Sequence, residues 1–130
     1  MGLLESSRAN PRYVFSPGGN RVWRLGDGGE IGSSTDGGRT WEPQTSGVQN
    51  DLMVGSAASD RVCWVAGKSG TVLLTRDGGK HWIQIVSPIE GEIGGIHAVD
   101  AQHASLWDQP KHRSFETSDG GVTWIPSANP

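Results

Sequence analysis

The sequence predicts an all-β fold built from three copies of a four-stranded unit, and three observations carry this prediction. The first is composition, because 20 of the 130 residues are glycine and seven are proline. Both residues disfavour helix interiors, so an all-α fold is excluded. The length is that of one domain with enough chain to bury a core. The other two observations are a repeated motif and the turn residues that separate short apolar runs.

The repeated motif is Ser/Thr-x-Asp-Gly-Gly-x-x-Trp, which occurs at 34–41, 75–82 and 117–124 with its aspartates 41 and 42 residues apart. A second tryptophan precedes each copy, and the spacing predicts one equivalent position for Trp23, Trp64 and Trp107. A period near 40 is typical of a supersecondary unit that stacks on its neighbours. We therefore divide the chain into an N-terminal arm (1–11) and a single repeat domain (12–130), with repeats at 12–46, 47–88 and 89–130.

Four short runs of apolar or β-branched residues recur in each repeat, and turn residues separate them. In the first repeat the predicted strands are 12–15, 21–25, 30–34 and 40–44. In the second repeat they are 52–56, 62–66, 71–75 and 82–86. In the third repeat they are 94–99, 104–107, 113–117 and 123–126. Twelve strands of about five residues have the ordinary strand length.

The aspartates of the motif look catalytic, but a structural role explains them better. Asp-Gly-Gly supplies the positive φ angles of a hairpin turn, and a short carboxylate accepts hydrogen bonds from the amides of its own turn. The tryptophan then starts the last strand and covers the turn. We assign this structural role to Asp36, Gly37, Gly38, Trp41, Asp77, Gly78, Gly79, Trp82, Asp119, Gly120, Gly121 and Trp124.

The motif resembles the Asp-box, or bacterial neuraminidase repeat, of many β-propellers. Each of the first two copies also follows a Trp-x-x-Gly-x-x-Gly-x-Val/Ile stretch, and 64–79 looks like a blade of the photosystem II stability/assembly-factor family. Relatives of that family occur widely in bacteria. The chain also resembles the C-terminal repeat region of bacterial anti-sigma-factor-like membrane proteins, without their zinc-finger module. The resemblance implies β-propeller-type blades and a non-enzymatic module for protein interaction, assembly or sensing.

Three blades raise a question of closure, because propellers usually have four to eight blades. Two chains that join as half-propellers would form a six-bladed homodimer. A fragment of a longer array, or three repeats closed as a β-trefoil, are the other arrangements that the sequence leaves open. The Asp-box resemblance favours blades. The third repeat departs from the pattern, with Pro110 and Arg113 where the other repeats have glycine. This departure predicts a cap of the stack, with a binding loop as the alternative.

A carbohydrate-binding or glycosidase-like domain of the sialidase type is the alternative function. Sialidase chemistry needs a Tyr–Glu pair, but Tyr13 is the only tyrosine and no acidic residue near it repeats. Hydrolysis by two carboxylates needs a suitably spaced pair, which Glu90 with Glu92 or Asp100 with Asp108 would supply only by chance. We therefore expect no enzyme activity and no catalytic residues.

Neither a cofactor nor a metal ion is expected. Typical zinc ligands include histidines spaced as HxH or HxxxH, and the four histidines of this sequence form no such pair. Cys63 is the single cysteine, so an internal disulfide is excluded, and its place in a strand predicts a buried, inert thiol.

The charge pattern limits the partners. A net charge of −3 gives no basic excess for nucleic acid, and the short apolar runs predict no membrane insertion by this segment. The N-terminus lacks the pattern of a secretion signal, so the location stays open, and it would be extracytoplasmic in a membrane-anchored anti-sigma-like protein. Half of the arginines lie in the first 24 residues. We single out Arg21 and Arg24 as candidate residues for binding an acidic protein partner.

Overall fold

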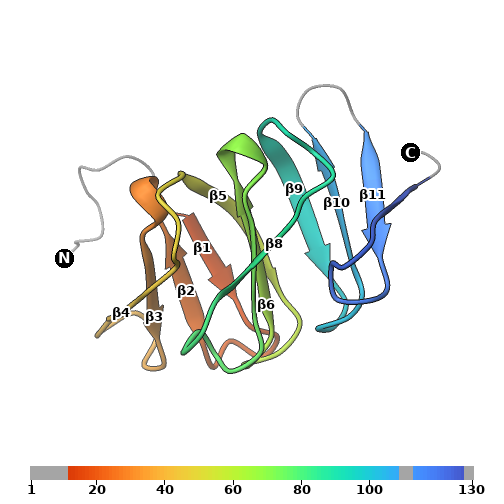
Figure 1. The fold of residues 1–130 in the computed structure, drawn as a ribbon. Coiled ribbons are helices and arrows are strands. Elements are labelled where there is room, and N and C mark those ends of the chain that lie inside the picture. Colours follow the sequence, from red (N-terminus) through yellow and green to blue (C-terminus); the bar gives the residue numbers. More distant parts are fainter. Residues whose placement is uncertain (1–11, 109–112, 128–130) are drawn as a thin grey trace.

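The computed structural model describes residues 12–108 and 113–127, which form three four-stranded antiparallel sheets in chain order. The expected arm at 1–11 and Pro110 lie outside the described residues. We call the sheets blades 1, 2 and 3, and Figure 1 shows them side by side with blade 2 in the middle. Within every blade the strands pair in sequence order, as an up-and-down meander.

The strand bounds follow the expected pattern within about two residues. Blade 1 contains β1 Arg12–Phe15, β2 Val22–Leu25, β3 Ile31–Ser34 and β4 Glu42–Gln44. Blade 2 contains β5 Leu52–Ala57, β6 Cys63–Gly67, β7 Val72–Thr75 and β8 Ile83–Ile85. Blade 3 contains β9 Ile93–Ala98, β10 Ala104–Asp108, β11 Ser114–Thr117 and β12 Ile125–Pro126. The last strand of each blade begins one residue after the motif tryptophan, not at it, because the turn continues through that residue.

Short 3-10 turns join the second and third strands of blades 1 and 2, at η1 Asp27–Gly29 and η2 Lys68–Gly70. Each turn ends on a glycine with positive φ, 83° at Gly29 and 68° at Gly70. A Cβ at Gly29 would collide with the backbone carbonyl of Val48, and one at Gly70 would collide with that of Ile89. These contacts explain why glycine stands at the end of both turns.

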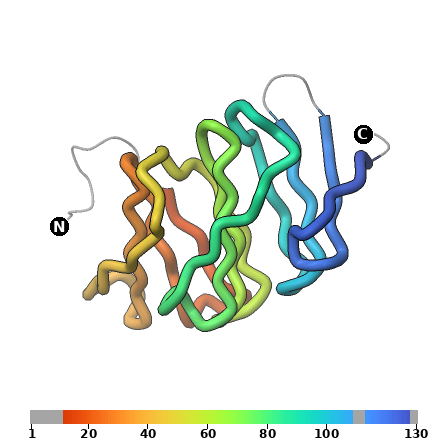
Figure 2. The backbone as a smooth tube through the Cα atoms, in the orientation of Figure 1, coloured from red at the N-terminus to blue at the C-terminus, as the bar shows by residue number. Residues whose placement is uncertain are grey.

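The core consists of two layers of side chains, one between each pair of neighbouring blades. Figure 2 shows the backbone of the three blades stacked in chain order. The layer between blades 1 and 2 contains Val14, Trp23, Leu25, Ile31, Leu52, Cys63, Val65 and Leu73. The layer between blades 2 and 3 contains Trp64, Ala66, Val72, Leu74, Ile89, Ile93, Ile96, Ala98, Ala104 and Leu106. Alternate residues of blade 2 therefore enter different layers, as the two-residue period of a strand requires.

This arrangement is that of propeller blades and not of the trefoil alternative. Among the described residues every hydrogen-bonded ladder joins strands of one repeat, whereas a trefoil closes its barrel by pairing strands of different repeats. The blades meet through side chains of their faces instead. The first strands of successive blades contact each other, β1 with β5 and β5 with β9.

One expectation about the tryptophans is wrong, because Trp107 does not occupy the position of Trp23 and Trp64. The ladder of blade 2 pairs Trp64 with Leu74, and the equivalent pair in blade 3 is Ser105 with Glu116. Trp107 lies two residues further along β10 and is 40% exposed, while Trp23 and Trp64 are fully buried. A shift of two residues keeps a side chain on the same face of a strand but moves it to the next cross-strand row.

Candidate functional site

The motif at 34–41 is a turn held by its own side chains. The hydroxyl group of Ser34 donates to Oδ1 of Asp36 at 2.8 Å and accepts from the amide of Gly38 at 2.9 Å. The same carboxylate oxygen accepts from the amides of Arg39 at 3.1 Å and Thr40 at 2.9 Å. The carboxylate of Asp36 therefore accepts its hydrogen bonds from residues of its own turn.

The other two turns repeat this geometry. In blade 2, Asp77 accepts from the hydroxyl group of Thr75 at 2.9 Å and from the amide of His81 at 2.9 Å. In blade 3, Asp119 accepts from the amide of Thr123 at 2.9 Å and from its hydroxyl group at 2.6 Å. The three turns therefore share one hydrogen-bonding scheme, although residues within them differ.

These hydrogen bonds keep the three aspartates ionised. The pKa of Asp36 and the pKa of Asp119 both fall to about 2, mainly because the hydroxyl group of the threonine four residues on donates to each carboxylate. The pKa of Asp77 falls well below its ordinary range, mainly because the ring of His81 lies 2.6 Å from Oδ2. A carboxylate with a lowered pKa is a poor general acid at neutral pH.

The Asp-box turn of blade 2 is also a docking point for blade 1. The carbonyl oxygen of Gly78 accepts from Nε1 of Trp23 at 3.3 Å, from Nε2 of Gln44 at 3.1 Å and from Nη1 of Arg21 at 3.4 Å. Nε1 of Trp82 in turn donates to Oε1 of Gln44 at 3.1 Å. Blade 1 therefore holds the turn of blade 2 through polar side chains at the edge of an apolar layer.

Blades 2 and 3 are joined in a related way. Nε1 of Trp64 donates to the carbonyl oxygen of Asp100 at 3.0 Å, and Nε1 of Trp124 donates to the carbonyl oxygen of Val86 at 3.1 Å. The two rings pack edge to face with centroids 6.1 Å apart. The motif tryptophan of one blade thus packs against the preceding blade.

The structure places the two candidate arginines on opposite faces of blade 1. Arg21 lies against blade 2, where Nη1 donates to the hydroxyl group of Ser33 at 2.7 Å and to Gly78. Arg24 lies on the face that neither of the other two described blades covers, with its guanidinium 4.5 Å from the ring centroid of Trp41. Of the two, Arg24 presents its charge away from the neighbouring blade.

The face around Arg24 is rich in aromatic side chains. Cross-strand pairing puts Tyr13, Arg24 and Gly32 in one row, and the rings of Tyr13 and Trp41 lie 6.1 Å apart. Phe15, on the same face, is 62% exposed. The hydroxyl group of Tyr13 is buried, and among the described residues it has no hydrogen-bond partner. We call Tyr13, Phe15, Arg24, Gly32 and Trp41 the blade 1 end face.

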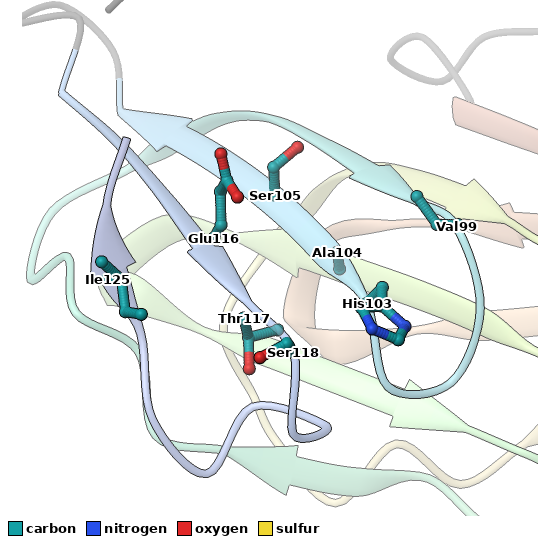
Figure 3. A pocket seen from close by; sticks show the side chains of 8 residues that line it. All are labelled: Val99, His103, Ala104, Ser105, Glu116, Thr117, Ser118 and Ile125. Atoms are coloured by element: carbon teal, nitrogen blue, oxygen red, sulfur yellow. The ribbon is translucent and has the colours of Figure 1, made fainter. Parts of the chain in front are cut away.

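The face at the opposite end of the array presents one carboxylate, Glu116, among polar and apolar side chains. One cross-strand row of blade 3 contains His97, Ser105, Glu116 and Ile125, with Ile125 63% exposed. These four residues and Trp107 make up what we call the blade 3 end face. A groove of about 420 Å³ lies on it. Figure 3 shows the side chains that line the groove, with His103 and Ile125 at opposite ends.

Trp107 lies on this face over a glycine of the neighbouring strand. It is paired with Gly95, and a Cβ there would collide with the indole ring. The turn that follows is one residue longer than in the other blades, since the amide of Asp108 bonds the carbonyl of Arg113 where Gly26 bonds Glu30. Asp108 is buried and accepts from Arg113 at 2.6 Å and 3.0 Å, so its carboxylate holds this turn.

The remaining candidates for chemistry are used in turns or buried. Asp100 accepts from the amide of His103 at 2.7 Å, so it is not free to act with Asp108 as a hydrolytic pair. Cys63 is fully buried, and burial raises the pKa of its thiol far above the ordinary range. In residues 12–108 and 113–127 no three His, Cys, Asp or Glu side chains lie close enough to hold a metal ion.

Sequence reasoning did not single out Glu116, although a signal was present. Glu116 precedes Asp119 by three residues, and Leu74 stands at the same distance from Asp77. A charged residue at a position that is apolar in the middle repeat indicates a face that does not receive an ordinary apolar layer.

The fold and its turns define a tandem Asp-box repeat protein with β-propeller-type blades. The family model described as photosynthesis system II assembly factor YCF48 matches residues 12–129. The chain belongs to this family.

Individual relatives agree with this assignment. The chain is 26% identical over 129 residues to the photosystem II assembly lipoprotein Ycf48 of Synechococcus sp. (strain CC9902), which covers 95% of this chain and 36% of that protein. A structure of YCF48 bound to D1 peptide has a TM-score of 0.77 and 27% identity over 91% of this chain and 40% of that one. YCF48 from Cyanidioschyzon merolae has a TM-score of 0.76 and 30% identity over 89% of this chain and 37% of that one.

Other similarities extend to the fold alone. The GH74 xyloglucanase from Xanthomonas campestris has a TM-score of 0.70 but only 14% identity, over 92% of this chain and 23% of that one. The chain spans less than half the length of the Ycf48 relatives that it matches. In the part of the chain that the structure describes, we find no helix with the length and apolarity to cross a membrane.

Proposed function

We propose that this chain is a non-enzymatic docking module that binds protein segments, as an assembly factor does. The observation that carries the proposal is the family match over residues 12–129, together with the relative whose structure holds a D1 peptide. A rigid stack of short blades suits this task, because it presents loops and open sheet faces on a scaffold that does not need to move.

The chemistry of the acidic residues supports a role without catalysis. Each Asp-box aspartate is held in its turn by several hydrogen bonds and has a lowered pKa. A retaining or inverting glycosidase needs one carboxyl group with a raised pKa to protonate the leaving group. None of the resolved pKa shifts of Asp or Glu among the described residues is a rise.

The blade 1 end face supplies the candidate docking surface for an acidic partner. Arg24 stacks on Trp41, and an arginine held over an aromatic ring keeps its donors available for carboxylates. Phe15 adds exposed apolar surface next to this charge. The homodimer expected from three blades is also part of this proposal.

A binding measurement with the peptide seen in the relative tests the docking function. Fluorescence anisotropy of labelled D1 peptide is followed as the chain is added, with a scrambled peptide of the same composition as control. We expect saturable binding of D1 peptide and a much weaker response to the scrambled one. Equal responses to both peptides would contradict sequence-dependent docking.

The alternative function is tested on the same preparation. Xyloglucan and sialoside substrates are incubated with the chain and reducing sugar is measured. We expect no release above the buffer blank. Hydrolysis that survives further purification and disappears on substitution of one Asp or Glu residue would overturn the non-enzymatic assignment.

A further inference from the structure

We propose that the blade 1 end face of one copy docks on the blade 3 end face of a second copy, head to tail, so that two chains close into a six-bladed ring. Arg24 of each copy then pairs with Glu116 of the other. The inference rests on the proposed docking function, and it names the acidic partner of Arg24 as a second copy of this chain.

The two internal interfaces supply the geometry of the third. In the layer between blades 2 and 3, Trp64 and Leu74 of one blade pack in the same cluster as Leu106 of the next. Cross-strand pairing puts Trp64 opposite Leu74, and Leu106 opposite Phe115. The row of blade 2 that contains Trp64 and Leu74 therefore lies in the same layer as the row of blade 3 that contains Leu106.

Blade 3 carries different residues on the row that would meet a further blade. Register places Ser105 at the position of Trp64 and Glu116 at the position of Leu74. Glu116 accepts a hydrogen bond from the hydroxyl group of Ser127 at 3.2 Å, but a carboxylate buried against an apolar layer without an opposite charge is strongly unfavourable. An ordinary apolar blade face would therefore fit poorly on Glu116, while a face with a cation at the facing position would fit well.

The blade 1 end face carries that cation at the required position. Register places Arg24 where blade 2 has Val65 and blade 3 has Leu106. In a third interface built like the other two, Arg24 and Glu116 would take the places that Leu106 and Leu74 share in one cluster. The two ends of the array are thus complementary in charge, and none of the three described blades covers either of them.

The shapes of the two faces are also complementary. The ring of Trp124 packs against Trp64 between blades 2 and 3, and Trp41 is the equivalent residue on the blade 1 end face. Its counterpart surface on blade 3 has the small Ser105 in place of Trp64, and the groove of about 420 Å³ lies there. The groove gives room for the ring of Trp41 with the guanidinium stacked on it.

A buried hydroxyl group on the blade 1 end face finds a partner in the same arrangement. Between blades 1 and 2, Cγ2 of Val14 lies 2.7 Å from the position that a Cβ of Gly55 would occupy, so these two positions face each other. Register makes His97 the equivalent of Val14, and Tyr13 the equivalent of Gly55. In the ring His97 would face Tyr13, whose hydroxyl group has no partner among the described residues.

The test measures molecular mass by light scattering on a sizing column over a concentration series. We expect a species of twice 13.8 kDa that dissociates on dilution. Arg24→Glu alone and Glu116→Arg alone should each raise the dimer dissociation constant by about tenfold or more, since like charges then face each other. The double variant, and an equimolar mixture of the two single variants, should restore the dimer because opposite charges meet again at both interfaces.

Two exposed charges outside both end faces serve as matched controls, Arg61→Glu between β5 and β6 and Glu90→Arg between β8 and β9, and both should leave the dissociation constant unchanged. Circular dichroism is used to check that each variant is folded. A monomer at every concentration, or a dimer indifferent to both end-face charges, would overturn the inference, and so would open polymers that grow with concentration. Peptide binding is measured separately, so none of these three results decides whether the chain binds D1 peptide.

Discussion

The register of blade 3 predicts a large difference between two tryptophans that the sequence makes look alike. Trp64 is fully buried and donates to Asp100, whereas Trp107 is 40% exposed and rests on Gly95. Substitution of a buried tryptophan by alanine costs about 3 to 5 kcal/mol of unfolding free energy, including the cavity that it leaves. Trp107→Ala should cost about 1 kcal/mol, because most of its ring surface already meets solvent or covers one glycine.

Such a loss is large compared with the whole stability of a domain, which is about 5 to 15 kcal/mol. Urea unfolding followed by circular dichroism gives the free energy without relying on tryptophan fluorescence. Both variants are made in the Glu116→Arg background, so that association with a second copy contributes to neither value. Trp64→Phe serves as a third variant that keeps an aromatic ring and loses the indole donor. Equal costs for Trp64→Ala and Trp107→Ala would refute the register assigned to β10.

Three further predictions concern the turns and the buried thiol. Because folding lowers the pKa of the Asp-box aspartates, their contribution to the free energy of unfolding should be constant above about pH 5 and should fall as pH drops from about 4 towards 2, as urea titrations between neutral and acidic pH will show. Gly29→Ala should lower the free energy of unfolding by more than about 2 kcal/mol, and Gly28→Ala by only about 1 kcal/mol. Both glycines have positive φ, but only a Cβ at Gly29 would collide with Val48. Thermal melts of the two variants compare these costs. Cys63 should react with a thiol reagent only at the rate of unfolding, which an absorbance assay with and without urea will measure.

Strand positions could be predicted from the sequence because each repeat supplies the same local signals three times. Turn residues bound every apolar run, so β1 begins and ends at the expected residues and the other strands differ by about two residues at most. The turns themselves were predictable for the same reason, since Asp-Gly-Gly needs no tertiary context to favour positive φ.

The position of Trp107 could not be read from spacing alone. Trp23 and Trp64 lie 13 residues before their motif aspartates, and Trp107 lies 12 before Asp119. The turn after β10 contains one extra residue, so the displacement along the strand is two and not one. The extra residue lengthens the spacing by one and the displacement shortens it by two, so the spacing shows only their difference and the ladder is needed to separate them.

The two arginines illustrate what strand period can add to composition. Arg24 is two residues from Val22 and one from Trp23, so alternation places it on the face opposite Trp23. Arg21 precedes β2, where alternation no longer holds strictly, and its contact with Gly78 depends on how blade 2 is placed. Composition counts both residues as one basic cluster, although Arg21 contacts blade 2 and Arg24 faces outward.

Each described blade contacts only the adjacent blades, and this affects how such arrays can gain a blade. Stability in an array of this kind is close to a sum of unit terms and neighbour terms. Blade 2 has an apolar row on both faces, while Arg24 lies on the outer face of blade 1 and Glu116 on the outer face of blade 3. Duplication of blade 2 would therefore extend the module with an interface that already exists, and the ends would keep their complementary charges.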